Sequence, residues 1–166
     1  IAMRLLAEER QSGTIALLYS SPVRDWEIVI GKFLSAFAFL ALMTLATGFM
    51  PAMILVHGKV SLGHVAGGYL GLLLLGGGAL AIGTLGSALA SSQVLAAITS
   101  AVMLVSLLVC WLLARVTERP LSEIFTALAF HSTHFQPFQA GVVHLKNVVY
   151  YVAVIYVALF AATRVV

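Results

Sequence analysis

Charged residues are scarce in this chain. Of its 166 residues only 9% are Asp, Glu, Lys or Arg, whereas 61% are hydrophobic, and the mean hydropathy is +1.07. A soluble domain carries roughly a quarter charged residues, so this composition predicts an all-α integral membrane protein. The formal net charge of +3 is small and scattered along the chain, which argues against a nucleic-acid partner.

Cysteine and catalytic motifs are nearly absent as well. The single cysteine, Cys110, cannot form an internal disulfide, and it lies in an apolar run where cysteine packs as a small apolar residue. Neither Gly31-Lys32 nor Gly58-Lys59 has the flanking glycine and hydroxyl residues of a phosphate-binding loop, and no His-Glu-x-x-His motif occurs. We therefore expect no cofactor, no metal and no catalysis by this chain, with any nucleotide chemistry in a separate chain.

Long apolar stretches are what the chain does contain. Residues 26–56, 64–90, 94–114 and 148–166 are each about long enough to cross a bilayer as a helix. In the first stretch Asp25 is the expected N-cap, Glu27 suits the first helical turn, and Pro51 predicts a kink near the far end. The sequence thus predicts four transmembrane helices.

Glycine is concentrated in the second of these stretches. Gly63, Gly67 and Gly71 are four residues apart and share one helix face, which predicts close packing of another helix there. The run Gly76–Gly78 has two interpretations. It is either a helix break, which marks substrate sites in secondary transporters, or a further place of close packing.

Residues 115–147 are too polar to span a membrane and too apolar for a free loop. They combine charged residues with four phenylalanines, which indicates one or two short helices at the membrane surface. His131 and His134 are three residues apart, but no cysteine or acidic residue lies nearby in the sequence to complete a metal site. This pattern favours interfacial histidines over a metal centre.

Residues 1–25 are polar and densely charged, and they lead directly into the first apolar stretch. We predict a helix that ends near Gly13, a short second helix that begins at Thr14, and a stop at Pro22. Two interpretations remain open: a docking element for a soluble partner, or an amphipathic segment that lies on lipid headgroups. For docking, the candidate residues are Glu8, Glu9, Arg10, Gly13, Thr14, Leu17, Leu18 and Pro22.

The distribution of basic residues gives an orientation. With four spans, five basic residues fall on the side of residues 1–25 and four on the other side. Because cytoplasmic loops carry an excess of Lys and Arg, this difference favours a cytoplasmic 1–25 segment in the cell membrane.

Two segments of the chain carry a family likeness. The run from Arg4 to Leu18, with Glu9 to Thr14 at its centre, then Ser21-Pro22-Val23 and the run from Asp25 to Phe33, resembles the permease subunits of ABC-2 type exporters. The likeness is greatest to the gliding-motility-like branch of bacterial permeases. The later segment with His134, Phe135, Phe138, Gly141, Tyr150 and Tyr151 is similar to that branch, which often has Asp in place of Asn147.

This resemblance implies a function and partners. Such permeases have about six membrane helices, so the chain would hold the last four and lack two at its start. Residues 1–25 would contain the cytoplasmic coupling helix that rests on a separate ATPase subunit. Residues 115–147 would form an external, re-entrant helical segment. Two permeases and two ATPases would form an ATP-driven exporter in the bacterial inner membrane.

Two other functions compete with this interpretation. One is a secondary transporter core that uses the Gly76–Gly78 run, although the interiors of the spans lack the ionisable residues that such carriers place there. The other is a membrane scaffold that only docks a partner. The same lack of charge favours a lipid-like or apolar cargo over a small ion.

Overall fold

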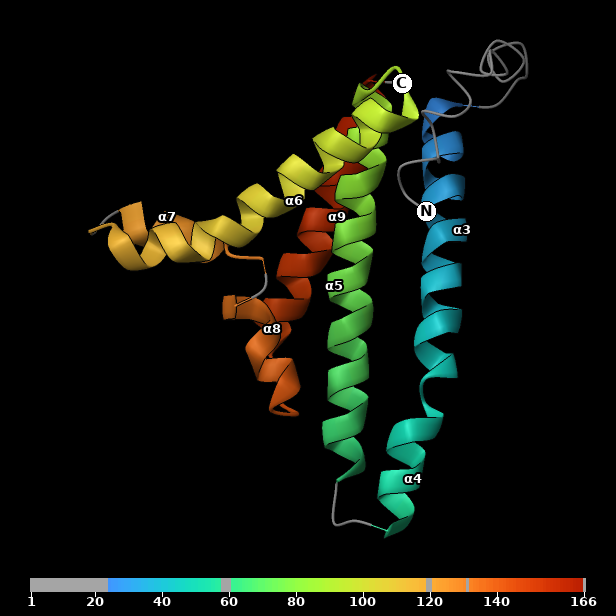
Figure 1. The fold of residues 1–166 in the computed structure, drawn as a ribbon, viewed down its shortest axis with the longest axis vertical. Coiled ribbons are helices and arrows are strands. Elements are labelled where there is room, and N and C mark those ends of the chain that lie inside the picture. Colours follow the sequence, from blue (N-terminus) through green and yellow to red (C-terminus); the bar gives the residue numbers. More distant parts are fainter. Residues whose placement is uncertain (1–23, 58–60, 119–120, 131, 166) are drawn as a thin grey trace. The chain divides into compact units, whose positions relative to one another are not determined.

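The computed structural model describes residues 24–57, 61–118, 121–130 and 132–165 (Figure 1). These residues form helices joined by short turns, with no strand among them. The helices are α3 (Asp25–Ala46), α4 (Phe49–His57), α5 (Leu62–Leu89), α6 (Gln93–Val116), α7 (Leu121–Leu128), α8 (Ser132–Gln139) and α9 (Leu145–Val165).

Four helical stretches of the described chain are long and apolar enough to cross a membrane. They are Asp25–Met53, Leu62–Leu89, Gln93–Val116 and Leu145–Val165, one for each apolar stretch of the sequence. The first includes α3 and the beginning of α4. The prediction of an all-α integral membrane protein with four spanning helices is therefore confirmed.

The beginning of α3 differs from the expected cap. The backbone N–H groups of Glu27 and Ile28 donate to the carbonyl of Arg24, at 2.9 and 3.4 Å. The N–H of Arg24 in turn donates to the Glu27 carboxylate at 3.0 Å. Arg24, not Asp25, is thus the N-cap, because its carbonyl accepts the first N–H bonds of the helix. Glu27, three residues further on, reaches back to the Arg24 N–H as in a capping box. Asp25 lies in the first turn, where a negative charge favours the helix dipole.

The first span is interrupted between α3 and α4. The N–H of Met50 donates to the Thr47 carbonyl at 3.1 Å, which is one residue short of the α-helical pattern. Pro51 has no N–H for that carbonyl, and its ring would collide with it in a regular helix. The interruption at Thr47 and Gly48 therefore has a physical cause in Pro51. The hydroxyls of Thr47 and Tyr69 lie 3.2 Å apart at this point.

The described chain divides into two compact units, which we treat separately. The first unit contains described residues 24–38, 77–104 and 153–165, and the second contains 39–57, 61–76, 105–118, 121–130 and 132–152.

The first unit has a small apolar core from three helices. Val29 of α3, Ala88 of α5 and Ala162 of α9 are buried together, and Ile28, Leu85 and Leu159 pack around them. Helix α6 approaches α5 through hydroxyls: Ser100 donates to the Gly83 carbonyl at 3.3 Å and Thr99 to the Gly86 carbonyl at 3.1 Å. Without a side chain at these glycines, the two helices can come close enough for such bonds.

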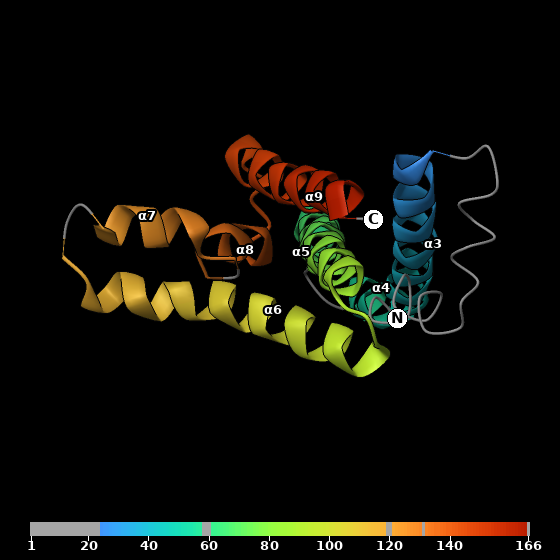
Figure 2. The same ribbon diagram turned by 90° about the horizontal axis from the view of Figure 1, so that it is seen from above.

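The second unit has an aromatic core. Phe135 and Phe138 of α8 and Tyr151 of α9 are buried, and α8 lies against α5 (Figures 1 and 2). Helix α7 folds back beside the end of α6, where the Ser122 hydroxyl donates to the Ala114 carbonyl at 3.0 Å (Figure 2). Gly141, with φ of +72°, forms the turn between α8 and α9, a backbone conformation that favours glycine.

Helix α5 is continuous from Leu62 to Leu89. The helix break that the run Gly76–Gly78 suggested is therefore wrong. In the second unit, a Cβ built on Gly76 would lie 2.6 Å from a methyl carbon of Leu40. In the first unit, a Cβ on Gly77 would lie 3.0 Å from the Phe37 ring. Both glycines sit at places of close packing.

Candidate functional site

The predicted coupling residues lie outside the described part of the chain. These are Glu8, Glu9, Arg10, Gly13, Thr14, Leu17, Leu18 and Pro22. The described chain begins at Arg24, directly after them. The structure therefore shows the start of α3, the helix to which this segment is directly connected.

The start of α3 is firmly anchored in the first unit. Val29 is completely buried against Ala88 and Ala162. One turn further on, Phe33 is buried and stacks on Phe37, with ring centroids 5.9 Å apart. A displacement of residue 24 therefore reaches α5 and α9 through packed side chains, since close-packed interiors transmit strain.

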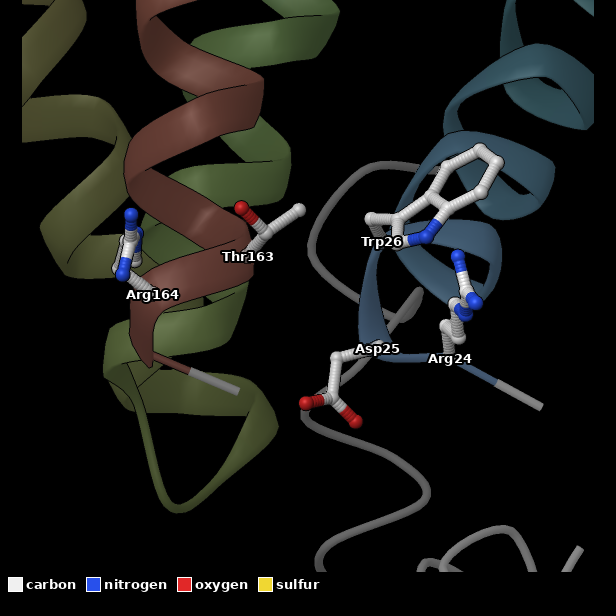
Figure 3. Close-up of a pocket in the computed structure, with 5 residues that line it drawn as sticks. All are labelled: Arg24, Asp25, Trp26, Thr163 and Arg164. Carbon is white, nitrogen blue, oxygen red and sulfur yellow. The ribbon is translucent and has the colours of Figure 1, made fainter. Parts of the chain in front are cut away.

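A surface depression lies beside this anchored start. It has a volume of about 430 Å³ and is lined by Arg24, Asp25 and Trp26 from the start of α3 and by Thr163 and Arg164 from the end of α9 (Figure 3). The Arg164 guanidinium carbon lies 5.1 Å from the centre of the Phe160 ring. The Arg164 guanidinium thus turns back along α9, and Figure 3 shows it on the opposite side of that helix from α3.

The predicted packing glycines have different surroundings. Gly67 meets the backbone of Gly141, to which a Cβ on Gly67 would come within 3.3 Å. Gly71 meets Phe138, whose own Cβ would lie 2.5 Å from a Cβ built on the glycine. Gly63 has no atom within 4 Å of such a Cβ among the described residues. Two of the three glycines thus face the α8 segment, which follows the third span.

A buried polar network joins α7, α8 and α9 in the second unit. His134 is buried, and its Nδ1 lies 3.1 Å from the Asn147 side-chain oxygen. The His134 ring stacks on the Tyr150 ring at a centroid distance of 3.8 Å. The Tyr150 hydroxyl donates to the Leu128 carbonyl at 3.1 Å, and the Tyr151 hydroxyl donates to the Phe130 carbonyl at 2.8 Å.

This network has a structural role. The last carbonyls of a helix lack partners within the helix, and in an apolar environment an unpaired carbonyl costs free energy. Hydroxyls from the first turns of α9 bond the carbonyls at the end of α7 and just beyond it. Sequence reasoning missed this network, although Asn147 and two adjacent tyrosines in an otherwise apolar run were a signal.

No metal site appears in the described residues. They contain no group of three or more His, Cys, Asp or Glu side chains that could hold an ion. His134 is engaged in the network above, and His131 lies outside the described residues.

The chain matches a known protein family. A family model described as ABC-2 family transporter protein matches residues 1–165. No curated protein and no solved structure matches the chain.

Proposed function

Because the chain belongs to the ABC-2 family of transporter proteins, it is a membrane-spanning permease subunit of an ABC transporter, and we propose how it works. Residues 1–25 form a cytoplasmic coupling segment that rests on a separate ATPase subunit. ATP hydrolysis in that partner moves the segment, and the motion drives export through the four spanning helices. The working unit contains a second permease in the bacterial inner membrane.

The anchored start of α3 is the observation that carries this proposal. A coupling segment can act on membrane helices only if its connection to them is stiff. The Glu27 carboxylate accepts from the Arg24 N–H and so closes the first turn of α3, which begins at Asp25. Four residues later Val29 is packed against α5 and α9. Force on residue 24 therefore moves three helices of the first unit together.

The residues before α3 suit a contact with a soluble partner. Glu8, Glu9 and Arg10 supply charges of both signs, which set the register and orientation of a docked helix more than its affinity. Leu17 and Leu18 supply an apolar surface for a groove in the ATPase. The competing interpretation, in which this segment lies on lipid headgroups, needs no partner at all.

The secondary-transporter alternative loses its main support. It depended on a break at Gly76–Gly78, whereas α5 is one continuous helix. Residues 62–90 also contain no Asp, Glu, Lys or Arg, the side chains that ion-coupled carriers place within the membrane. This lack of charge supports an apolar or lipid-like cargo.

The proposal predicts that substitutions in residues 1–25 uncouple the permease from its ATPase subunit while the permease still inserts in the membrane. We expect Glu9→Trp or Gly13→Leu to abolish co-purification with the ATPase subunit, or its stimulation in proteoliposomes, while the permease still inserts in the membrane. Gly31→Ala serves as the control, because a Cβ there meets no described atom within 4 Å. Wild-type stimulation in both variants would rule out docking through residues 1–25.

A further inference from the structure

The hydroxyl of Tyr156 belongs to the middle of a spanning helix. Along α9, Tyr156 is about 15 Å from Lys146 in the first turn and about 12 Å from Arg164 in the last turn, at 1.5 Å per residue. The hydrocarbon core of a bilayer is about 30 Å thick, so this residue falls within it. Tyrosines of membrane proteins are enriched at the two interfaces instead. Tyr156 therefore lies at a depth where lipid offers no hydrogen-bond partner.

This hydroxyl has no hydrogen-bond partner among the described residues. The Tyr156 side chain is 69% exposed, and its ring stacks on the Phe160 ring with centroids 6.2 Å apart. A hydroxyl without a hydrogen bond costs free energy in an apolar medium, and polar side chains within a membrane accordingly face other protein groups or water. We therefore expect a polar group of another molecule, and not lipid tails, to cover this face of α9.

Tyr156 is part of a row on the outer side of α9. The row consists of four residues at intervals of three, four and three positions, namely Ala153, Tyr156, Phe160 and Thr163. This is the spacing with which two nearly parallel helices interlock. Phe160 precedes the completely buried Ala162 by two residues, which turn a helix by about 200°, so the row faces away from the core of the first unit. The small side chain of Ala153 lets another helix approach closely.

A second copy of the chain would satisfy the hydroxyl by symmetry. Two copies with the same orientation in the membrane are related by a twofold axis along its normal, so identical residues lie at the same depth. A tyrosine hydroxyl both donates and accepts, so two such hydroxyls can bond each other. The Arg164 guanidinium is held over the Phe160 ring, 5.1 Å from its centre, and Arg164 itself follows the last position of the row.

We propose that this row is the contact between two identical permeases. The two α9 helices cross at Tyr156, and the two Tyr156 hydroxyls bond each other in the middle of the membrane. The Phe160 rings pack beside them on the same face. The proposal rests on the second permease of the proposed function, and it adds that this permease is an identical chain and that α9 is the surface it meets.

Disulfide cross-linking of the full-length permease, in membranes that also contain its ATPase subunit, tests the contact. Cys110 is first replaced by serine, and single cysteines are then oxidised with copper phenanthroline. We expect Tyr156→Cys to give a cross-linked dimer. Two controls should give none: Val157→Cys, which is 64% exposed but points to another side of α9, and Val105→Cys, which is 55% exposed near the middle of α6.

The hydroxyl is tested separately from the shape of the helix. Tyr156→Phe keeps the ring and should weaken self-association in lipid vesicles about three- to tenfold, the range for a hydrogen bond between membrane helices. Energy transfer between labelled permeases measures this affinity. Tyr69→Phe is the matched control, because the Tyr69 hydroxyl has its partner, Thr47, in the same chain at 3.2 Å. This control should keep the wild-type affinity.

Several results would overturn the proposal. They are an unchanged affinity of Tyr156→Phe, cross-linking at Val157→Cys or Val105→Cys as strong as at Tyr156→Cys, and a fluorophore at Tyr156→Cys that spin-labelled lipid chains quench as strongly as one at Val157→Cys. A dimer that forms without the Tyr156 cross-link would remove this contact and leave the second permease of the proposed function in place. A wild-type chain that stays monomeric beside its ATPase subunit would remove both.

Discussion

Alanine substitutions along α5 give the sharpest test of its packing. Gly68 and Gly71 lie one turn apart in the same helix and in the same unit, yet their surroundings differ. A Cβ on Gly68 meets no atom within 4 Å among the described residues. A Cβ on Gly71 would lie 2.5 Å from the Cβ and 2.8 Å from the Cγ of Phe138. The matched pair therefore differs in packing but not in chemistry.

The expected difference follows from these distances. Carbon atoms pack at about 3.5–4.0 Å, so Phe138 would have to retreat by roughly 1 Å to admit the new methyl group. Phe138 is completely buried and the position of its Cβ is fixed by the backbone of α8, so no rotamer change relieves the contact. Overpacking of this kind costs about 1–3 kcal/mol. The helix propensity of alanine over glycine, about 1 kcal/mol, is common to both variants and cancels.

The measurement is the free energy of unfolding in mixed micelles for Gly68→Ala and Gly71→Ala. We expect Gly71→Ala to be less stable than Gly68→Ala by about 1–3 kcal/mol. Gly67→Ala falls between them, because its Cβ would come within 3.3 Å of Gly141, and Gly63→Ala behaves like Gly68→Ala. Equal stabilities of Gly68→Ala and Gly71→Ala, or Gly63→Ala as the least stable of the four, would refute the packing of α8 on α5.

Three further substitutions probe other contacts. Tyr151→Phe leaves the Phe130 carbonyl without its 2.8 Å bond and should lower the free energy of unfolding by about 1–3 kcal/mol in the same micelle assay. Gly86→Ala should weaken the packing of α6 on α5, since its Cβ would lie 2.9 Å from the Ser100 backbone nitrogen. The yield of cross-linking between cysteines introduced in α5 and α6 should then fall. Pro51→Ala restores an N–H donor and should raise hydrogen-exchange protection over residues 47–52, and unchanged protection there would contradict the assigned cause of the interruption.

The spanning helices could be predicted because hydropathy acts locally. A stretch without charge must form a helix in lipid, since every backbone polar group has to be bonded within the segment. The same reasoning indicated that Pro51 would disturb the first span. It failed at Asp25, because the N-cap is the residue whose carbonyl accepts the first N–H bonds of the helix. That residue is Arg24, whose own N–H donates to the Glu27 carboxylate.

The contacts between helices could not be predicted in the same way. The pairing of His134 with Asn147, and of Tyr151 with Phe130, joins residues 13 and 21 positions apart in the sequence. Such pairs depend on how α8 is placed, and the hydropathy pattern carries no information about that. The spacing of Gly63, Gly67 and Gly71 likewise defined a helix face but not where along it a neighbour would lie.

Helix α5 supplies a glycine-rich packing surface in each unit. In the second unit Gly67 and Gly71 admit the α8 segment, and in the first unit Gly83 and Gly86 admit the hydroxyls of α6. Lipid offers no hydrophobic gain for bringing helices together, so close backbone approach and interhelical hydrogen bonds have to supply the attraction. A helix that packs on several neighbours in this way cannot carry large side chains at those positions. This requirement explains the glycines at which a Cβ would crowd a neighbour, among them Gly76 and Gly77 within an unbroken helix, whereas Gly63 and Gly68 have open surroundings among the described residues.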